Sequence, residues 1–415
     1  MTSTSCKAVA REVLEQCLAG RPPEEIPAAL LEEAGGQALF GILVEGLADR
    51  FEPALCDIYA RLFSRAVAGV IGDAGDADRA RMVARYERVR RARPIAGDPR
   101  RIFVLSRVTL GADIAVTSVL MDAAKRRFPR AEVVFVGPRK NYELFAGDPR
   151  IHHAEAGYQR GGLRDRLAAA AEVKALLASD ESADSVVIDP DSRLTQLGLV
   201  PVCREDLYHL FESRAYGGDS ERPLPELAAA WAAETFGMGG ARPYVALGGQ
   251  APDAQTLGAQ PLGAPCVAVS FGVGDNPAKR MPDPFEEELL KLLAARGVTV
   301  CIDKGAGGEE AARVERAVER SGVRASYWEG SFAGFAALVA GSRLYVGYDS
   351  AGQHVAAACG VPLIAIFAGF PVPRMFHRWR PLGERCDVIR VDRPAVAEVL
   401  ARVRQAIGTA LYDLG

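Results

Sequence analysis

The sequence predicts an α/β protein with two doubly wound domains and a helical N-terminal region. Alternating strands and helices of the βαβ type begin near Arg101, and the same alternation begins again at Cys266. Residues 1–95 show helical periodicity only. Repeated strand–helix units form a parallel sheet that helices cover on both faces. Two such runs in one chain therefore indicate two sheets, each with its own core.

The length of the chain agrees with this division. At 415 residues it is too long for a single ordinary core. Glycine, proline and glutamine are frequent just before the second run, which predicts a linker. We expect five segments: a helical extension (1–95), a first doubly wound domain (100–240), the linker (241–265), a second doubly wound domain (266–392) and a closing helix (393–415).

The helical extension ends in an arginine-rich stretch. Val9, Val13 and Leu14 recur at helical spacing near its start, whereas Arg79 to Arg101 contains nine arginines. A solvated helix face followed by a linker is the simpler explanation of such a run. The alternative is contact with an anionic membrane surface or an acidic partner.

Short apolar runs that are bounded by turn residues predict buried strands. In the first α/β run these strands are expected at Ile102–Leu105, Glu132–Val136, Glu143–Phe145 and Val186–Ile188, with helices at Ile114–Phe128 and Leu224–Phe236. In the second run strands are expected at Cys266–Phe271, Val298–Ile302, Leu344–Gly347, Val361–Phe367 and Val388–Val391. Helices are expected between them at Phe285–Ala295, Glu309–Ser321, Phe332–Ala340 and Gln353–Cys359. An apolar stripe from Val396 to Leu411 predicts the closing helix.

Composition and charge exclude several classes of function. The chain is 49% hydrophobic and 25% charged, and a formal net charge of -3 gives no bulk reason to expect nucleic acid as a partner. The eight cysteines include no CxxC pair, so reduced thiols are expected rather than zinc or a disulfide framework. A signal pattern and a long apolar run are both lacking, and we therefore expect a cytoplasmic protein.

The stretch from Val346 to Phe367 carries the clearest chemistry. It predicts a strand, a turn, a helix and a second strand. Asp349 and Ser350 are residue types that cap a helix start. A helix N-terminus at the carboxyl end of a parallel sheet is a binding site for phosphate. His354 lies in the first turn of this helix, which predicts a diphosphate site there.

Three segments together resemble glycosyltransferase family 9, the ADP-heptose:lipopolysaccharide heptosyltransferases. They are RIFVLSRVTLGADIAVTSVLMDAAKRRFP, VSFGVGDNPAKRMPDPFEEELLKLL and VGYDSAGQHVAAACGVPLIAIF, and the resemblance covers roughly residues 100 to 392. It implies the GT-B fold, in which two Rossmann-like domains face each other. Here residues 100–240 would be the acceptor domain and 266–392 the nucleotide-sugar donor domain. The helical extension is not part of the usual family pattern.

Two family motifs are altered in this chain. The GD pair of the family becomes Gly111-Ala112-Asp113, and its DTG becomes Asp349-Ser350-Ala351 with glycine one place later. The spacing of five from Asp349 to His354 is kept. These departures bear on the sugar and the acceptor more than on the fold.

The resemblance implies a donor site and a catalytic base. Lys279, with Arg280 as a weaker candidate, would neutralise the diphosphate. Asp113 would be the general base, and its alternative role is the N-cap of a helix that begins at Ile114. The expected donor-binding residues are Ser270, Gly272, Val273, Lys279, Arg280, Glu309, Asp349, Ser350, Gly352, Gln353 and His354.

Acceptor contacts are expected from two segments of the first domain, DPDSRLTQ and FESRAYGG, the second of which contains Glu212. The expected acceptor-binding residues are Asp191, Arg193, Gln196 and Arg214. Asp189 and Asp191 also form a DxD pattern, which holds a metal in GT-A transferases. We expect acceptor contact rather than a metal here.

The sequence thus predicts an inverting, metal-independent glycosyltransferase. It would move a heptose-like sugar from a nucleotide-diphosphate donor, with ADP favoured, to an acceptor hydroxyl. The acceptor could be a glycan, a lipid-linked molecule, a metabolite or a protein, and no cofactor is expected beyond the nucleotide sugar. The alternatives are a non-catalytic GT-B protein that binds a nucleotide sugar or a partner, and a sugar-nucleotide epimerase.

Overall fold

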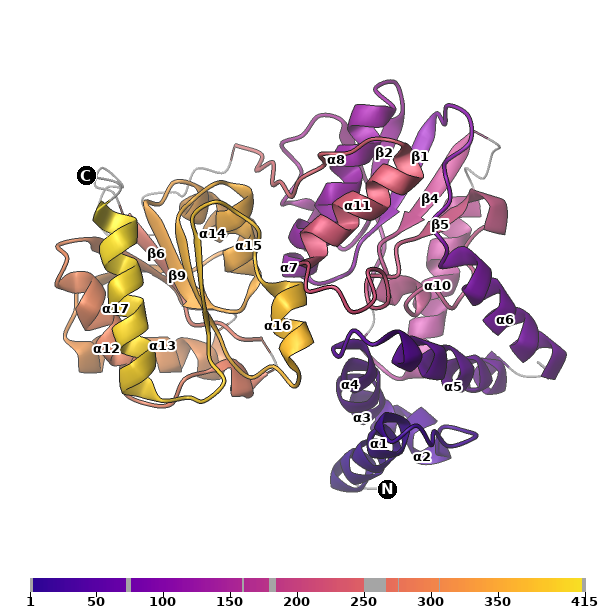
Figure 1. Ribbon diagram of the computed structural model, residues 1–415, viewed down its shortest axis with the longest axis horizontal. Coiled ribbons are helices and arrows are strands. Elements are labelled where there is room, and N and C mark those ends of the chain that lie inside the picture. The colour runs from indigo at the N-terminus through magenta and orange to yellow at the C-terminus, as the bar shows by residue number, and fades with distance from the viewer. Residues whose placement is uncertain are drawn as a thin grey trace. The chain divides into compact units, whose positions relative to one another are not determined.

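The computed structural model describes residues 3–71, 76–158, 160–178, 184–249, 266–274, 276–305 and 307–412 (Figure 1). Residues 250–265 of the expected linker lie outside these ranges. The chain folds as two compact units. The first contains Met1–Thr109, Val116–Tyr142 and Arg150–Arg242, and the second contains Leu110–Ala115, Glu143–Pro149 and Pro243–Gly415.

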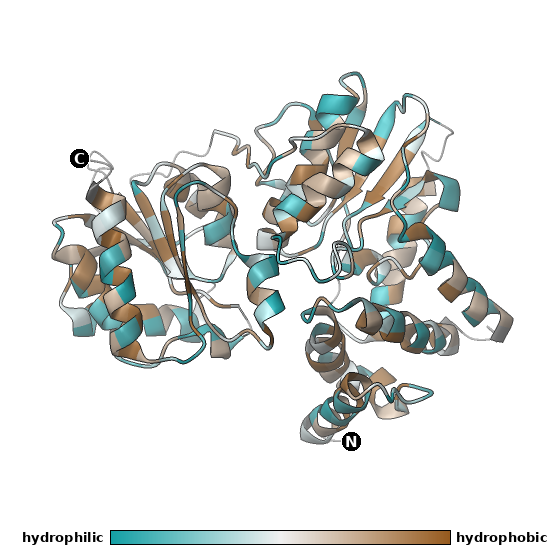
Figure 2. Ribbon diagram, viewed as in Figure 1, coloured by the Kyte–Doolittle hydropathy of each residue, from teal (hydrophilic) through white to brown (hydrophobic). Residues whose placement is uncertain are grey.

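The first unit is built on a parallel sheet with the order β3-β2-β1-β4-β5. Its strands are β1 (Arg101–Leu105), β2 (Glu132–Gly137), β3 (Ile151–Glu155), β4 (Ser185–Asp189) and β5 (Tyr208–Leu210). The central strand β1 pairs with both neighbours, so that Val104 lies opposite Phe135 and Ile188. Strands that are covered on both faces are expected to be apolar throughout, and the sheet strands in Figure 2 are mainly brown.

Helices from the same segment of chain complete this α/β layer. They are α7 (Leu110–Ala112), a π-helical turn (Asp113–Thr117), α8 (Ser118–Arg127), α9 (Arg139–Tyr142), α10 (Leu163–Ala178) and α11 (Leu224–Phe236). Helices α8 and α11 pack against each other, whereas α10 packs against α5 (Pro53–Ile71) of the extension (Figure 1). Two short 3-10 turns lie at Arg193–Thr195 and Glu205–Leu207.

The N-terminal extension is helical, as the sequence predicts. Its elements are α1 (Ser3–Leu18), α2 (Ala28–Leu31), a 3-10 turn (Glu33–Gly35), α3 (Gly36–Ala38), a π-helix (Leu39–Val44), α4 (Glu45–Ala48), α5 (Pro53–Ile71) and α6 (Asp76–Val89). One hydrophobic core joins the extension to the first sheet, since Leu43 and Phe63 belong to the same cluster as Phe103 and Val187. The extension is therefore part of the first unit rather than an appendage.

Polar contacts reinforce this junction. Tyr59 donates from its hydroxyl to the carbonyl of Gln196 at 3.0 Å, and the Arg85 guanidinium donates to the carbonyl of Gly198 at 3.0 Å. Arg88 forms an ion pair with Glu205 at 2.7 Å. Several arginines of the basic stretch thus bind the first sheet's connections. These contacts favour a structural role for those arginines over contact with a membrane.

The second unit is built on a parallel sheet with the order β11-β10-β9-β6-β7-β8. Its strands are β6 (Cys266–Ser270), β7 (Thr299–Asp303), β8 (Ala325–Trp328), β9 (Leu344–Tyr348), β10 (Leu363–Phe367) and β11 (Cys386–Arg390). Its helices are a 3-10 turn (Pro277–Lys279), α12 (Phe285–Ala294), α13 (Gly308–Ser321), α14 (Phe332–Ala340), α15 (Ala351–Ala358), α16 (Pro373–Trp379) and α17 (Val396–Tyr412). Helix α12 packs against α13 and α17, and α14 packs against α15.

The predicted fold class is confirmed: two parallel sheets with helices, and an additional helical region at the N-terminus. The expected strand at Glu143–Phe145 is wrong, because these residues form a turn and the third strand is β3 instead. Phe145 is buried for a different reason. Its ring packs against Tyr244 with centroids 5.8 Å apart, and Leu144 accepts a hydrogen bond from the amide of Ala246 at 2.8 Å. Within the described ranges, no helix has the length and apolar character needed to cross a bilayer.

A glycine substitution tests the contact between the extension and the first sheet's connections. A Cβ on Gly36 would lie 2.7 Å from the Cα of Gly162, whereas a Cβ on Gly41 would meet nothing within 4 Å. We expect Gly36→Ala to lower the free energy of unfolding by about 1–3 kcal/mol, because backbone must move to admit the methyl group. Urea unfolding followed by circular dichroism measures this change.

Gly41→Ala is the matched control within the same helical extension. It should leave stability unchanged or raise it by up to about 1 kcal/mol, because alanine favours the helical backbone. Equal stabilities for the two variants would contradict the close approach of Gly36 to Gly162.

Candidate active site

The expected site residues gather where the strand order of each sheet reverses. In the first sheet this point lies between β1 and β4, and in the second between β6 and β9. Ligands of open α/β sheets bind at the carboxyl ends of strands at such a point. Asp191 follows β4, and Ser270 and Asp349 end or follow β6 and β9. The topology therefore places the predicted residues at the edge of each sheet that suits a ligand.

An ion pair joins the two loops at the switch point of the second sheet. The Nζ of Lys279 lies 2.6 Å from Oδ2 of Asp349, with exposed side-chain fractions of 19% and 7%. The Nε2 of Gln353 donates to Oδ1 of the same carboxylate at 2.5 Å. Lys279 is thus positioned beside the first turn of α15, where the sequence predicts a diphosphate.

His354 lies in this first turn and is buried, with 6% of its surface exposed. Burial lowers the pKa of its imidazole to about 4, with the cation of Lys279 also lowering it and the carboxylate of Asp349 opposing the shift. The ring is therefore neutral at pH 7 and can serve a diphosphate only through a hydrogen bond. Its edge faces Trp379 of α16, with ring centroids 6.2 Å apart.

The start of α15 is shaped by Tyr345 of β9. Ser350 occupies the N-cap position as expected, but its side chain makes no capping hydrogen bond and lies 3.3 Å from the hydroxyl of Tyr345. A Cβ on Gly352 would lie 2.4 Å from that hydroxyl, and one on Gly347 would lie 2.6 Å from it. The tyrosine side chain therefore explains why glycine is needed at position 352.

The loops after β6 and β7 meet around a carboxylate. A Cβ on Gly272 would lie 2.8 Å from Oε1 of Glu310, and one on Gly305 would lie 2.5 Å from its carboxyl group. Burial, with a smaller contribution from the charge of Glu310, raises the pKa of the neighbouring Asp303 to about 6. The expected donor residue Glu309 is exposed, so the next residue in sequence is the one that contacts these loops.

The three remaining donor candidates also belong to the second unit. Ser270 is buried, and its hydroxyl lies 3.4 Å from both Oδ2 of Asp303 and the amide of Gly272. Val273 is buried as well. Arg280 lines a separate cavity of about 850 Å³ with the loops that follow β10 and β11. A donor role for these residues remains a prediction.

Asp113 is buried and begins a π-helical turn directly after α7. Its alternative role as an N-cap is wrong, because the helix already begins at Leu110. The segment Leu110–Ala115 belongs to the second unit. Within that unit, a Cβ on Gly111 would lie 3.1 Å from Cδ2 of His354, so the glycine that precedes Asp113 by two residues lies beside this imidazole. Single π-helical turns inside helices are frequent at functional sites.

The expected acceptor residues make protein contacts in the first unit. Asp191 accepts from the Nε of Arg214 at 3.0 Å and from the hydroxyl of Ser213 at 2.9 Å. Arg193 forms an ion pair with Glu45 of the extension at 3.2 Å. Gln196 is buried and donates to the carbonyl of Arg193 at 2.9 Å. These contacts fix the segment in place, and their role toward an acceptor remains a prediction.

The DxD pattern is also built into this network. Asp189 accepts hydrogen bonds from the amide of Ser192 at 2.6 Å and from the hydroxyls of Thr195 and Tyr208, both at 2.5 Å. Protein donors thus hold this carboxylate, which leaves it poorly suited to a metal. In the part of the chain that the structure describes, no cluster of three or more potential metal-ligating side chains occurs.

Sequence reasoning missed Asp303, Glu310 and Tyr345. Asp303 ends a strand and Glu310 lies in the first turn of a helix, so their positions in the sequence could have identified both of them as candidates. The signal for Tyr345 is weaker, because a buried tyrosine in a strand is common. Only the three-dimensional packing against Gly347 and Gly352 identifies its role.

Comparison with known proteins gives a consistent result. The family model described as glycosyltransferase family 9 (heptosyltransferase) matches residues 196–405, and no curated protein matches the chain.

Among solved structures, a family 9 glycosyl transferase from Veillonella parvula aligns with a TM-score of 0.59 and 15% identity, covering 77% of this chain and 99% of that one. The E. coli heptosyltransferase WaaC with ADP aligns with a TM-score of 0.55 and 18% identity, covering 75% and 99%. E. coli ADP-heptose heptosyltransferase II aligns with a TM-score of 0.53 and 18% identity, covering 75% and 99%.

Gly352→Ala tests the packing of Tyr345 against α15. We expect a loss of about 1–3 kcal/mol in the free energy of unfolding, because the added methyl group would lie within 2.7 Å of the ring. Gly341→Ala is the control, since its Cβ would lie 3.6 Å from the nearest atom, the carbonyl oxygen of Ala337. Urea unfolding of both variants gives the comparison, and an undisturbed Gly352→Ala protein would contradict the packing.

The pKa of His354 predicts a pH dependence of stability. The unfolded imidazole binds a proton with a pKa of 6.5 and the folded one with a pKa of about 4, so acid favours the unfolded chain. Between pH 7 and pH 5 this group should cost about 2 kcal/mol of stability. His354→Gln should lose that part of the pH dependence in urea unfolding, whereas the control His152→Gln, at an exposed position, should keep it.

Proposed function

The chain belongs to glycosyltransferase family 9 and is a glycosyltransferase, and we propose that it transfers a heptose-like sugar from an ADP-linked donor to an acceptor hydroxyl with inversion. The observation that carries this proposal is the Lys279–Asp349 pair at the start of α15. It brings a cation to the positive end of a helix, which is an arrangement that suits a diphosphate. The presence of ADP in the structure of WaaC supports the choice of nucleotide.

In the proposed reaction Asp113 is the general base. Its carboxylate takes the proton of the acceptor hydroxyl as the oxygen attacks the anomeric carbon from the face opposite the diphosphate. The bond between that carbon and the phosphate oxygen breaks, and its electron pair leaves with ADP. No metal is required in this scheme, because positive charge at the leaving group comes from protein groups.

The residues around the leaving group have distinct roles in this proposal. Lys279 neutralises charge on the diphosphate, and the first-turn amides of α15 donate hydrogen bonds to it. His354 contributes a neutral N–H, because its pKa of about 4 leaves the ring uncharged at pH 7. Glu310, rather than Glu309, is the better candidate for contact with hydroxyls of the nucleotide sugar, since it lies against the loops after β6 and β7.

Asp113→Asn tests the assignment of the base. The amide keeps the size of the side chain but accepts no proton at neutral pH, so transfer should fall by at least about 10³-fold. Binding of ADP, measured by calorimetry, should stay within about threefold of wild type, because the substitution leaves the diphosphate contacts in place. Release of ADP from ADP-heptose is followed with lipid-linked glycans, small alcohols and proteins as acceptors.

Lys279→Met tests the proposed contact between the lysine and the diphosphate. It should weaken ADP binding by about tenfold or more, since a charge-assisted hydrogen bond to phosphate contributes about 1.5–3 kcal/mol. Retained turnover in Asp113→Asn would overturn the base assignment. Donor binding by the wild-type protein with no turnover on any acceptor would favour the non-catalytic alternative, and isomerised donor without acceptor would indicate an epimerase.

A further inference from the structure

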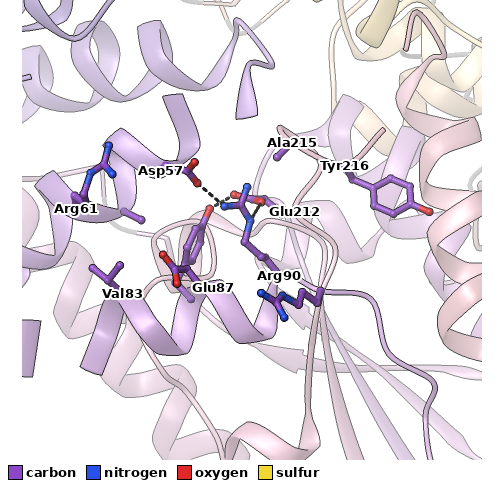
Figure 3. A pocket seen from close by; sticks show the side chains of 11 residues that line it. Asp57, Arg61, Val83, Glu87, Arg90, Glu212, Ala215 and Tyr216 are labelled. Carbon is purple, nitrogen blue, oxygen red and sulfur yellow. Dashed lines mark hydrogen bonds and ion pairs between the residues drawn. The ribbon is translucent and has the colours of Figure 1, made fainter. Parts of the chain in front are cut away.

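A cavity of about 500 Å³ lies in the first unit between the extension and the loop after β5 (Figure 3). Helices α5 and α6 supply one side of it, and residues 212–216 supply the other. Its lining residues are Asp57, Ala60, Arg61, Val83, Tyr86, Glu87, Arg90, Arg91, Glu212, Ala215 and Tyr216. A space of this volume can hold one or two sugar rings or a short peptide.

The polar groups of the cavity are held in fixed positions. Arg90 donates from Nε to Glu212 at 2.7 Å and from a terminal nitrogen to Asp57 at 2.5 Å. The hydroxyl of Tyr86 also donates to Glu212, which is 3% exposed (Figure 3). A guanidinium has five N–H donors and a carboxylate accepts about four hydrogen bonds. These groups can therefore serve a ligand in addition to their protein partners.

The acidic and basic side chains that line the cavity are equal in number, and burial raises the pKa of the Glu212 carboxyl group to about 7. Asp57, Glu87 and Glu212 supply three carboxylates, and Arg61, Arg90 and Arg91 supply three guanidinium groups. An anionic ligand would lie close to the carboxylates, and a cationic ligand would lie close to the arginines. Paired donors and acceptors without an excess of either sign suit a neutral ligand with many hydroxyl groups.

The cavity also has apolar surface for such a ligand. Ala60, Val83 and Ala215 line its walls, whereas the ring of Tyr216 points away from the other lining side chains (Figure 3). The hydroxyl of Tyr216 donates to Glu234, and its ring packs edge-on against Phe211 with centroids 5.5 Å apart. Small apolar side chains next to paired polar groups match the two-sided character of a sugar ring, which has apolar C–H faces and polar edges.

A buried polar network connects the cavity to the switch point of the first sheet. Arg214 lies 3.7 Å from Glu212 and 3.0 Å from Asp191. Arg107, which follows β1, donates to Ser213 at 2.8 Å and lies 3.9 Å from Asp191. The network therefore runs from the carboxyl end of β1, past that of β4, to the loop after β5. It links the cavity to Arg107 and Asp191 within the first unit.

We propose that this cavity binds an uncharged, hydroxyl-rich carbohydrate unit of the acceptor. The proposal rests on the proposed function in naming the ligand as part of an acceptor. The extension supplies eight of the eleven lining residues. Acceptor recognition would therefore depend on a region outside the usual family pattern.

Saturation-transfer NMR of the full-length protein without donor tests this proposal. The probes are glucose, galactose, mannose, N-acetylglucosamine and lactose. We expect at least one of them to bind, and Val83→Trp to weaken that binding by tenfold or more because the indole fills the cavity from α6. Ala84→Trp is the matched control, since it adds the same side chain at the next, exposed position and should leave the affinity within twofold.

The proposal would be overturned if no probe binds, or if binding persists in Val83→Trp. It would also be overturned if glucose 6-phosphate or a serine–glycine peptide binds in the cavity more strongly than every neutral sugar. Urea unfolding followed by circular dichroism checks that Val83→Trp keeps the fold of the first unit, to which the cavity belongs. These measurements need no turnover, so a failure of sugar binding can be distinguished from a failure of glycosyl transfer. Saccharide binding without glycosyl transfer would refute the proposed function alone, and transfer without saccharide binding would refute the cavity assignment alone.

Discussion

The ion pair between Lys279 and Asp349 organises the site in the second unit. It joins the loop after β6 to the start of α15, the two segments that flank the strand-order reversal. Asp349 is 7% exposed, so removal of the lysine would leave a buried carboxylate without its cation. In the proposed reaction a diphosphate shares or displaces this contact, while Gln353 continues to hold the carboxylate through its second oxygen. The loop is therefore ordered before a donor arrives.

A close backbone approach fixes the same loop from its other side. Gly369 has a φ of +70°, and a Cβ there would lie 2.4 Å from the carbonyl oxygen of Ala278. Only glycine allows the chain after β10 to approach the 3-10 turn of Lys279 so closely. The lysine thus extends from a turn that is restrained by backbone packing and by an ion pair. Such restraint reduces the ordering that a ligand must impose when it binds.

Much of the fold could be predicted from local pattern, and the reasons for the failures are physical. The helices at Leu224–Phe236 and Phe332–Ala340 match their expected ranges, because each is a sustained apolar segment with clear ends. The sheet-edge strands β3, β5 and β8 were missed. β5 and β8 have only three and four residues, and β3 contains polar residues that suit a sheet edge rather than a buried strand.

The candidate site shows the same limit. The phosphate-type loop of α15 could be recognised from Asp349 to His354, since its signals are adjacent in sequence. The partner of Arg193 could not, because Glu45 is 148 residues away along the chain. The low pKa of His354 depends on burial that no local pattern reports. Long-range packing therefore decides which of the predicted side chains are charged, and which already have a protein partner.

The shared core of the first unit has a consequence for the modular use of this fold. Phe40 of the extension lies under the guanidinium of Arg166 in α10, 3.5 Å from its carbon, and belongs to the same apolar cluster as residues of the first sheet. In this chain a graft that omitted the first ninety residues would strip away part of its own interior. The smallest transferable piece of the first unit therefore includes the extension.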